Sequence, residues 1–108
     1  MKTDKDDAGN IYVAFEPDDI DPIQSALRLV EELKPSAIPI ECTIVKETLD
    51  SSRKDQDYRF RPDKFKTIFQ ALRSVLDQAI GLTKDSNLSV KYAHMSNRID
   101  NLLNHYAS

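Results

Sequence analysis

Hydrophobic residues in the second half of the chain recur at alternating steps of four and three over two adjoining segments. This spacing is typical of helices that pack along one narrow seam. A short polar stretch, residues 83–87, separates the segments, and a connection of this length lets two helices fold back on each other. The pattern therefore predicts an antiparallel helical hairpin over residues 62–106. The first series is Phe65, Phe69, Leu72, Leu76 and Ala79, and the second is Leu88, Tyr92, Met95, Ile99, Leu102 and Tyr106.

The first half of the chain mixes strand and helix signals. Residues 11–15 are rich in branched and aromatic side chains, which predicts a short strand. Asp21 followed by Pro22 is a typical start of a helix, and Pro35 ends the apolar periodicity that follows. Gly81 is expected to end the first hairpin helix as a left-handed cap.

Two further segments precede the hairpin. Residues 38–45 alternate apolar and polar side chains, which predicts a strand, and Pro39 favours an edge position. The polar stretch 48–57 is expected to be a loop, and residues 58–61 a third short strand or the approach to the next helix. We expect an α+β fold dominated by helix: a short sheet and one helix, followed by the long αα-hairpin. The alternative is an all-α bundle in which residues 38–46 are extended but unpaired.

The length of the chain limits the number of domains, and its charge is unevenly distributed. At 108 residues the chain is expected to be a single small domain over residues 10–108, preceded by a disordered acidic N-terminus at residues 1–9. The net charge is only −3, but residues 1–21 are acidic and residues 53–66 are basic.

Cys42 is the one cysteine, so no disulfide within the chain is expected. No secretory signal or apolar run of membrane-spanning length is found. We therefore expect a cytoplasmic protein.

The two helical seams have two interpretations. They can face each other and the first helix to form the core of one chain. Part of this surface can also pair with a second copy, because a helical hairpin buries little apolar area by itself and two hairpins make a four-helix bundle. The residues assigned to such a homodimer are Phe69, Leu72, Leu76, Met95, Ile99 and Leu102.

Both histidines lie on the last predicted helix, within a polar row on one face. The simplest interpretation of the row is a solvated face. His94 and His105 are eleven residues apart, about 16 Å along a helix, so one metal ion cannot join them. We expect no metal site and no cofactor. The row consists of Lys91, His94, Arg98, Asn101 and His105.

Arg98 and His105 frame six residues, and this spacing resembles the signature of HEPN ribonucleases. The resemblance covers eight residues and implies a dimeric helical bundle that cleaves RNA without metal. In that case His105 would be the general acid or base and Arg98 would steady the phosphate. The family usually has a polar residue after the arginine, where this chain has Ile99. If both side chains are instead solvated, replacing either by alanine changes stability by at most about 0.5 kcal/mol.

The basic segment 53–66 interleaves cations with aromatic residues. Arg59, Phe60, Arg61 and Lys64 are the candidate partner-binding residues, because cations beside an aromatic ring suit an acidic protein surface. They also suit the bases and phosphates of a nucleic acid. Alternatively Phe60 belongs to the core and the charges around it are solvated.

No nucleophile motif or phosphate-binding loop is present, and two glycines are too few for the latter. We therefore expect a small non-catalytic protein that binds another macromolecule, most readily a protein with an acidic surface. It would be an adaptor, an accessory subunit or an inhibitor, encoded by a cell, a phage or a mobile element. The alternative is an RNA-directed protein, either a binder through residues 53–66 or a HEPN-like ribonuclease.

Overall fold

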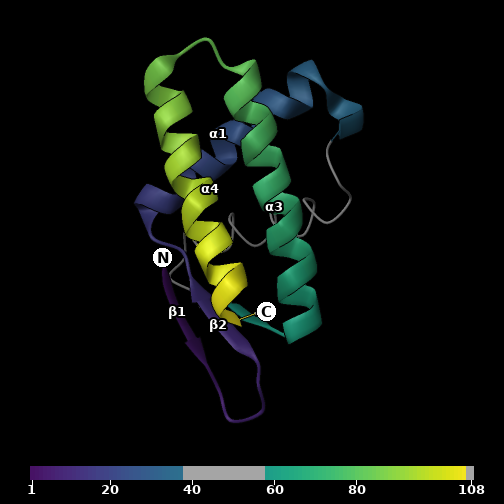
Figure 1. The fold of residues 1–108 in the computed structure, drawn as a ribbon, viewed down its shortest axis with the longest axis vertical. Coiled ribbons are helices and arrows are strands. Elements are labelled where there is room, and N and C mark those ends of the chain that lie inside the picture. The colour runs from purple at the N-terminus through teal and green to yellow at the C-terminus, as the bar shows by residue number, and fades with distance from the viewer. Residues whose placement is uncertain (38–57, 107–108) are drawn as a thin grey trace.

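A helical hairpin, a third helix behind it and a small sheet make up the fold of the computed structural model, which describes residues 1–37 and 58–106 (Figure 1). This confirms the helix-dominated α+β class and excludes the all-α alternative. The expected strand at 38–45 and loop at 48–57 lie outside the described residues. The elements are β1 (Lys2–Lys5), β2 (Ile11–Ala14), α1 (Pro17–Leu33), the 3₁₀ turn η1 (Pro35–Ala37), β3 (Tyr58–Phe60), α3 (Pro62–Leu82) and α4 (Ser86–Tyr106).

β2 is the central strand of the sheet and pairs antiparallel with β1 on one side and β3 on the other. Ile11 and Val13 on β2 are buried, whereas the alternate residues Tyr12 and Ala14 are half-buried, so one face of the strand covers the core. The third strand near residue 58 is thus present. Ile11 lies opposite Phe60 in the register.

The first nine residues differ from the expected disordered terminus, because residues 2–5 form β1. This strand has mostly exposed side chains and no alternating apolar pattern, so nothing local indicates it. Its backbone pairing with β2 holds it, and the turn that connects the two strands is closed by hydrogen bonds between Asp6 and Asn10. Gly9 in this turn has φ of 88°, a conformation that side chains with a Cβ rarely adopt.

α1 begins earlier than Asp21 and Pro22 indicate. Its N-cap is Glu16, with Pro17 in the first turn, and the Glu16 and Asp19 side chains form a capping box. Pro22 therefore lies inside the helix, where it has no N–H for the carbonyl group of Asp18. The early start adds more than one turn to α1 and brings the acidic residues before Asp21 onto the helix.

α3 and α4 form the expected hairpin and lie side by side in Figure 1. α3 continues through Gly81, which has no positive φ, so the predicted left-handed cap is wrong; Thr83 follows in an extended conformation. α4 starts after Asp85, whose carboxylate accepts hydrogen bonds from the backbone N–H groups of Asn87 and Leu88. Polar contacts join the helices along their length: the Arg73–Asp100 ion pair and a 2.7 Å hydrogen bond from Ser96 to Asp77.

α1 crosses behind the hairpin, and the sheet packs at the end where α3 begins and α4 ends (Figure 1). Aromatic rings fill this end: Phe65 stacks on Phe69 at 4.4 Å between centroids, and Phe60 meets Phe69 edge-on at 5.9 Å. Tyr106 at the end of α4 contacts Phe65, and its hydroxyl donates a 3.1 Å hydrogen bond to the hydroxyl of Thr3 on β1. The two seams predicted from the sequence thus meet inside one chain.

Candidate binding cleft between α1 and α4

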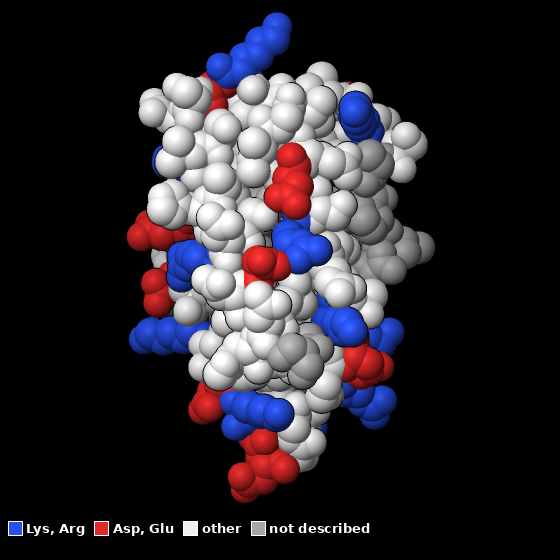
Figure 2. Space-filling view, in the orientation of Figure 1, with Lys and Arg blue, Asp and Glu red and all other residues white. Residues whose placement is uncertain are grey.

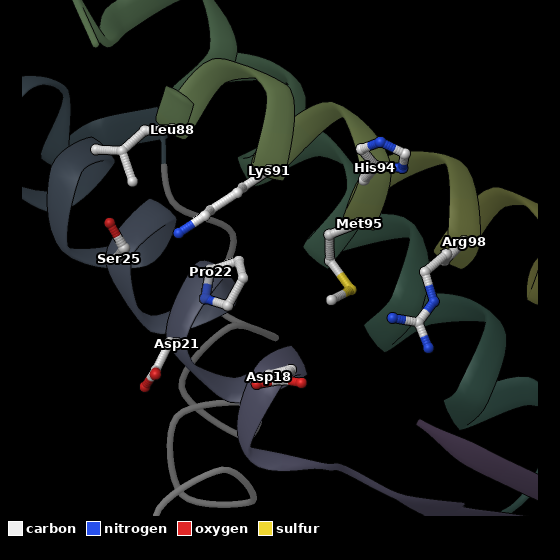
Figure 3. A pocket seen from close by; sticks show the side chains of 9 residues that line it. All are labelled: Asp18, Asp21, Pro22, Ser25, Leu88, Lys91, His94, Met95 and Arg98. Atoms are coloured by element: carbon white, nitrogen blue, oxygen red, sulfur yellow. The ribbon is translucent and has the colours of Figure 1, made fainter. Parts of the chain in front are cut away.

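A cleft of about 500 Å³ lies between the first half of α1 and the middle of α4 (Figure 3). The two helices run in opposite directions here, since Asp19 near the start of α1 contacts Arg98 while Ser25 further along contacts Tyr92. The α1 residues stand three or four positions apart, which places them on one face of the helix. The lining consists of Asp18, Asp21, Pro22 and Ser25 from α1 and Leu88, Lys91, His94, Met95 and Arg98 from α4.

The floor of the cleft is apolar. Met95 is buried and its thioether points into the space between the helices (Figure 3). Pro22 and Leu88, also on the floor, are half-buried. Beneath them, the hydroxyl groups of Ser25 and the fully buried Tyr92 share a 2.6 Å hydrogen bond, so the Tyr92 hydroxyl is satisfied without a ligand.

The rim is charged and divided by sign. Asp18 and Asp21 on the α1 wall are exposed, as are Lys91 and His94 on the α4 wall. Lys91 extends across the cleft toward α1 (Figure 3). None of these four side chains forms an ion pair with another described residue. The rim therefore offers anionic and cationic groups that remain available to a binding partner.

Arg98 at the end of the cleft is different, because it is bound within the chain. Its guanidinium donates a 2.8 Å hydrogen bond to Asp19, whose side chain is only 1% exposed. The other carboxylate oxygen of Asp19 lies 2.5 Å from the amino group of Met1 and accepts a 3.0 Å hydrogen bond from the backbone N–H of Glu16. Asp19 thus joins Met1, which precedes β1, and the start of α1 to Arg98 on α4.

The sequence-based interpretation of the polar row on α4 was a solvated face. All five residues are exposed; Lys91, His94 and Arg98 also line the cleft, whereas Asn101 and His105 lie beyond it. The α1 wall was missed, because a helix that starts at Asp21 does not include Asp18. Once the helix starts at Pro17, the spacing of Asp18, Asp21 and Ser25 shows that they share a face.

The pair that resembles the HEPN signature is placed as follows. Arg98 is held by Asp19, as described above. His105 is exposed near the end of α4, with its ring edge-on to that of Tyr106 at 4.6 Å. The two residues are separated by two turns of the same helix.

The predicted partner-binding segment is partly on the surface and partly in the core. Arg59, Arg61 and Lys64 are exposed around the end of β3 and the start of α3. Phe60 is buried against Phe65 and Phe69, so its ring is not available for stacking on a base. Among residues 59–66, the segment thus presents exposed cations, while its two aromatic rings, Phe60 and Phe65, are buried.

Most of the residues assigned to a homodimer face the core of the single chain. Five of them are buried there, and the sixth, Leu102, is partly buried against the same core. A second copy could reach the five only if the helices separated. The buried five are Phe69, Leu72, Leu76, Met95 and Ile99.

Comparisons with known protein families, with curated proteins and with solved structures find no match to this chain. Within residues 1–37 and 58–106, no three His, Cys, Asp or Glu side chains gather closely enough to hold a metal ion. None of the described helices combines the length and the apolar character that crossing a membrane requires.

Proposed function

We propose that this protein is a non-catalytic binding module that recognises another protein through the cleft between α1 and α4. It would act as an adaptor, an accessory subunit or an inhibitor, and we place it in the cytoplasm, consistent with a single cysteine. The observation that carries the proposal is the apolar floor inside a rim of charges without partners among the described residues. A partner that covers the floor would bury apolar area and neutralise the rim.

The shape of the cleft favours a protein over a small molecule. Sites for small molecules usually enclose most of the ligand surface. Here Asp18, Asp21, Lys91 and His94 are exposed, and only Met95 among the lining residues is buried. An apolar centre within a polar, accessible rim is the usual anatomy of a protein–protein interface.

The proposal is tested by site-specific photo-crosslinking. A benzophenone amino acid placed at Lys91 on the rim is expected to form a covalent adduct with a partner in a lysate of the source cells. The same amino acid at Lys84, an exposed residue in the α3–α4 connection, serves as the matched control. An adduct from Lys91 that is absent from Lys84 and is lost when Asp21 is changed to Lys supports the proposal. Equal adducts from both positions, or none from Lys91, contradict it.

The exposed cations Arg59, Arg61 and Lys64 support a second contact with the partner protein, outside the cleft. They suit an acidic surface on the same partner, and the charge reversals Arg59→Glu and Arg61→Glu would slow association most strongly at low salt. The face of α3 and α4 in Figure 2 shows both signs of charge interspersed. Among the described residues on that face, no continuous basic surface of the kind that tracks a nucleic-acid backbone is seen.

The RNA-directed alternative has its own test. His105→Ala removes the general acid or base that the HEPN resemblance implies; His105 is exposed, and the substitution removes its ring contact with the neighbouring Tyr106. Under our proposal this variant behaves as the parent protein does. Loss of RNA cleavage by His105→Ala, with an unchanged circular dichroism spectrum, would favour the ribonuclease.

A further inference from the structure

On α1, hydrophobic side chains continue beyond the lining of the cleft. Leu29 and Leu33 follow Ser25 at intervals of four residues, so the three side chains form a row along α1. Leu33 is 55% exposed at the end of this row. On α4, Val90 is 58% exposed, one turn before His94 on the rim. Among the described residues, these are the two large hydrophobic side chains that have more than half of their surface exposed to solvent.

The two walls of the cleft have opposite charge. The α1 wall is acidic through Asp18 and Asp21, and the α4 wall is basic through Lys91, with His94 beside it. Arg98 adds to the basic wall but is already paired with Asp19. An occupant that is uniformly acidic or uniformly basic would therefore face like charges on one of the two walls. Like charges brought together at an interface cost binding free energy and discriminate against the wrong partner.

From these features we propose that the cleft receives an amphipathic helix of a partner protein with an apolar stripe between one basic and one acidic flank. The stripe would lie on Met95, Pro22 and Leu88, with the basic flank toward α1 and the acidic flank toward α4. Two helices that form a groove commonly hold a third in this way. The elongated apolar row toward Leu33 suits a helix, because side chains at i, i+3, i+4 and i+7 can follow it. This inference rests on the proposed function.

Defined synthetic peptides test the inference. Three lactam-stapled helices of about four turns carry the same leucine stripe, and stapling is needed because such short helices are marginal in water. One has a lysine flank and a glutamate flank, one has two lysine flanks, and one has two glutamate flanks. We expect the mixed peptide to bind the full chain about tenfold more tightly than either uniform peptide in a fluorescence anisotropy titration.

Reversing the charge of one wall at a time is expected to change which of the three peptides binds most tightly. Lys91→Glu with His94→Glu makes both walls acidic, so the peptide with two lysine flanks should become the tightest binder. Asp18→Lys with Asp21→Lys makes both walls basic, so the peptide with two glutamate flanks should become the tightest. Lys84→Glu changes charge on an exposed residue outside the cleft and should leave the order unchanged. Circular dichroism confirms that each variant is folded.

The inference is overturned if the parent chain binds none of the three peptides, or if the wall variants leave the order of affinity unchanged. These results are separable from failure of the proposed function. If the benzophenone at Lys91 still captures a partner, the cleft binds a protein but not a helix of this charge pattern. If the crosslink and the peptides both fail, the cleft is not the binding site.

Discussion

Asp19 and Arg98 show how one buried charge organises three elements. The Asp19 carboxylate is 1% exposed and has Arg98, the Met1 amino group and the Glu16 backbone as partners. A buried carboxylate is tolerated only with such partners, because burial of a charge without them is costly. Arg98, although 50% exposed, is therefore more than a solvated side chain.

Replacement of Arg98 tests this role. We expect Arg98→Ala to lower the free energy of unfolding by about 1–2 kcal/mol, because Asp19 loses one charged hydrogen-bond partner while solvent reaches the vacated position. This exceeds the change of at most about 0.5 kcal/mol expected for an exposed residue from the sequence. Urea denaturation measures the difference, and Lys91→Ala is the exposed control from the same helix. Equal denaturation midpoints for both variants would show that the contact between Arg98 and Asp19 does not contribute to the free energy of unfolding.

Asp6 makes a pH-dependent contribution in the β1–β2 turn. Desolvation by its neighbours raises its pKa, but hydrogen bonds from the backbone and side chain of Asn10 and from the backbone of Ala8, with Arg59 nearby, lower the pKa below its ordinary value. The folded chain therefore favours the ionised form more than the unfolded chain does. The resulting stabilisation is present above the ordinary carboxyl pKa of about 4 and is lost as the pH falls through the lowered value.

We accordingly expect Asp6→Ala to lower the melting temperature at neutral pH and to have a progressively smaller effect as the solution is acidified below about pH 4. Asp7→Ala, which removes an exposed carboxylate one residue further on, is the control. Thermal melts followed by circular dichroism over this pH range make the comparison. A melting difference for Asp6→Ala that stays constant with pH would contradict an electrostatic origin.

At the level of elements, Phe60 joins the sheet to the hairpin. It belongs to β3, lies opposite Ile11 on β2 and packs its ring against Phe65 and Phe69 of α3. Its neighbours Arg59 and Arg61 point to solvent. Within β3, the alternation of side chains along a strand thus places Phe60 in the core and Arg59 at the surface, and Arg61 follows as the N-cap of α3.

Phe60→Ala should therefore act on stability, with a loss of about 3 kcal/mol that is typical of a buried phenylalanine. Arg59→Glu and Arg61→Glu in the same strand region should leave the melting temperature nearly unchanged, because exposed substitutions usually have small effects. The three variants are compared by chemical denaturation. If Phe60→Ala proves neutral for stability but weakens binding to a partner, the ring is a contact residue rather than part of the core.

For the whole molecule, the burial of both apolar seams inside one chain bears on whether these residues can also form a homodimer interface. Leu72 and Ile99 are fully buried where α3 and α4 pack in one chain. A carboxylate at either position would be desolvated without a partner. We expect Leu72→Asp and Ile99→Asp to unfold the protein, seen as loss of the helical circular dichroism signal. A folded monomer from either variant, together with a dimer of the parent by light scattering, would instead assign these residues to an interface between copies.

The sequence by itself determined the elements whose stability is local. The 3.5-residue repeat places α3 and α4 nearly to the residue, because an apolar seam can be buried only if the helix keeps its period. The strand beginning at Ile11 was also indicated, since the preference of β-branched side chains for extended backbone acts within a few residues. The helical hairpin and the α+β class follow from these elements.

Only the tertiary structure decided the start of α1, the strand β1 and the cleft. Both Glu16–Pro17 and Asp21–Pro22 are acceptable helix starts, and the first is chosen where Asp19 gains partners from Met1 and Arg98, which are distant in sequence. β1 forms because β2 offers its backbone groups, although its own side chains are polar. The cleft needs α1 and α4 to cross at one point, so its two walls, some seventy residues apart, carry no signal in either segment alone. Such sites depend on long-range packing, and no local pattern encodes them.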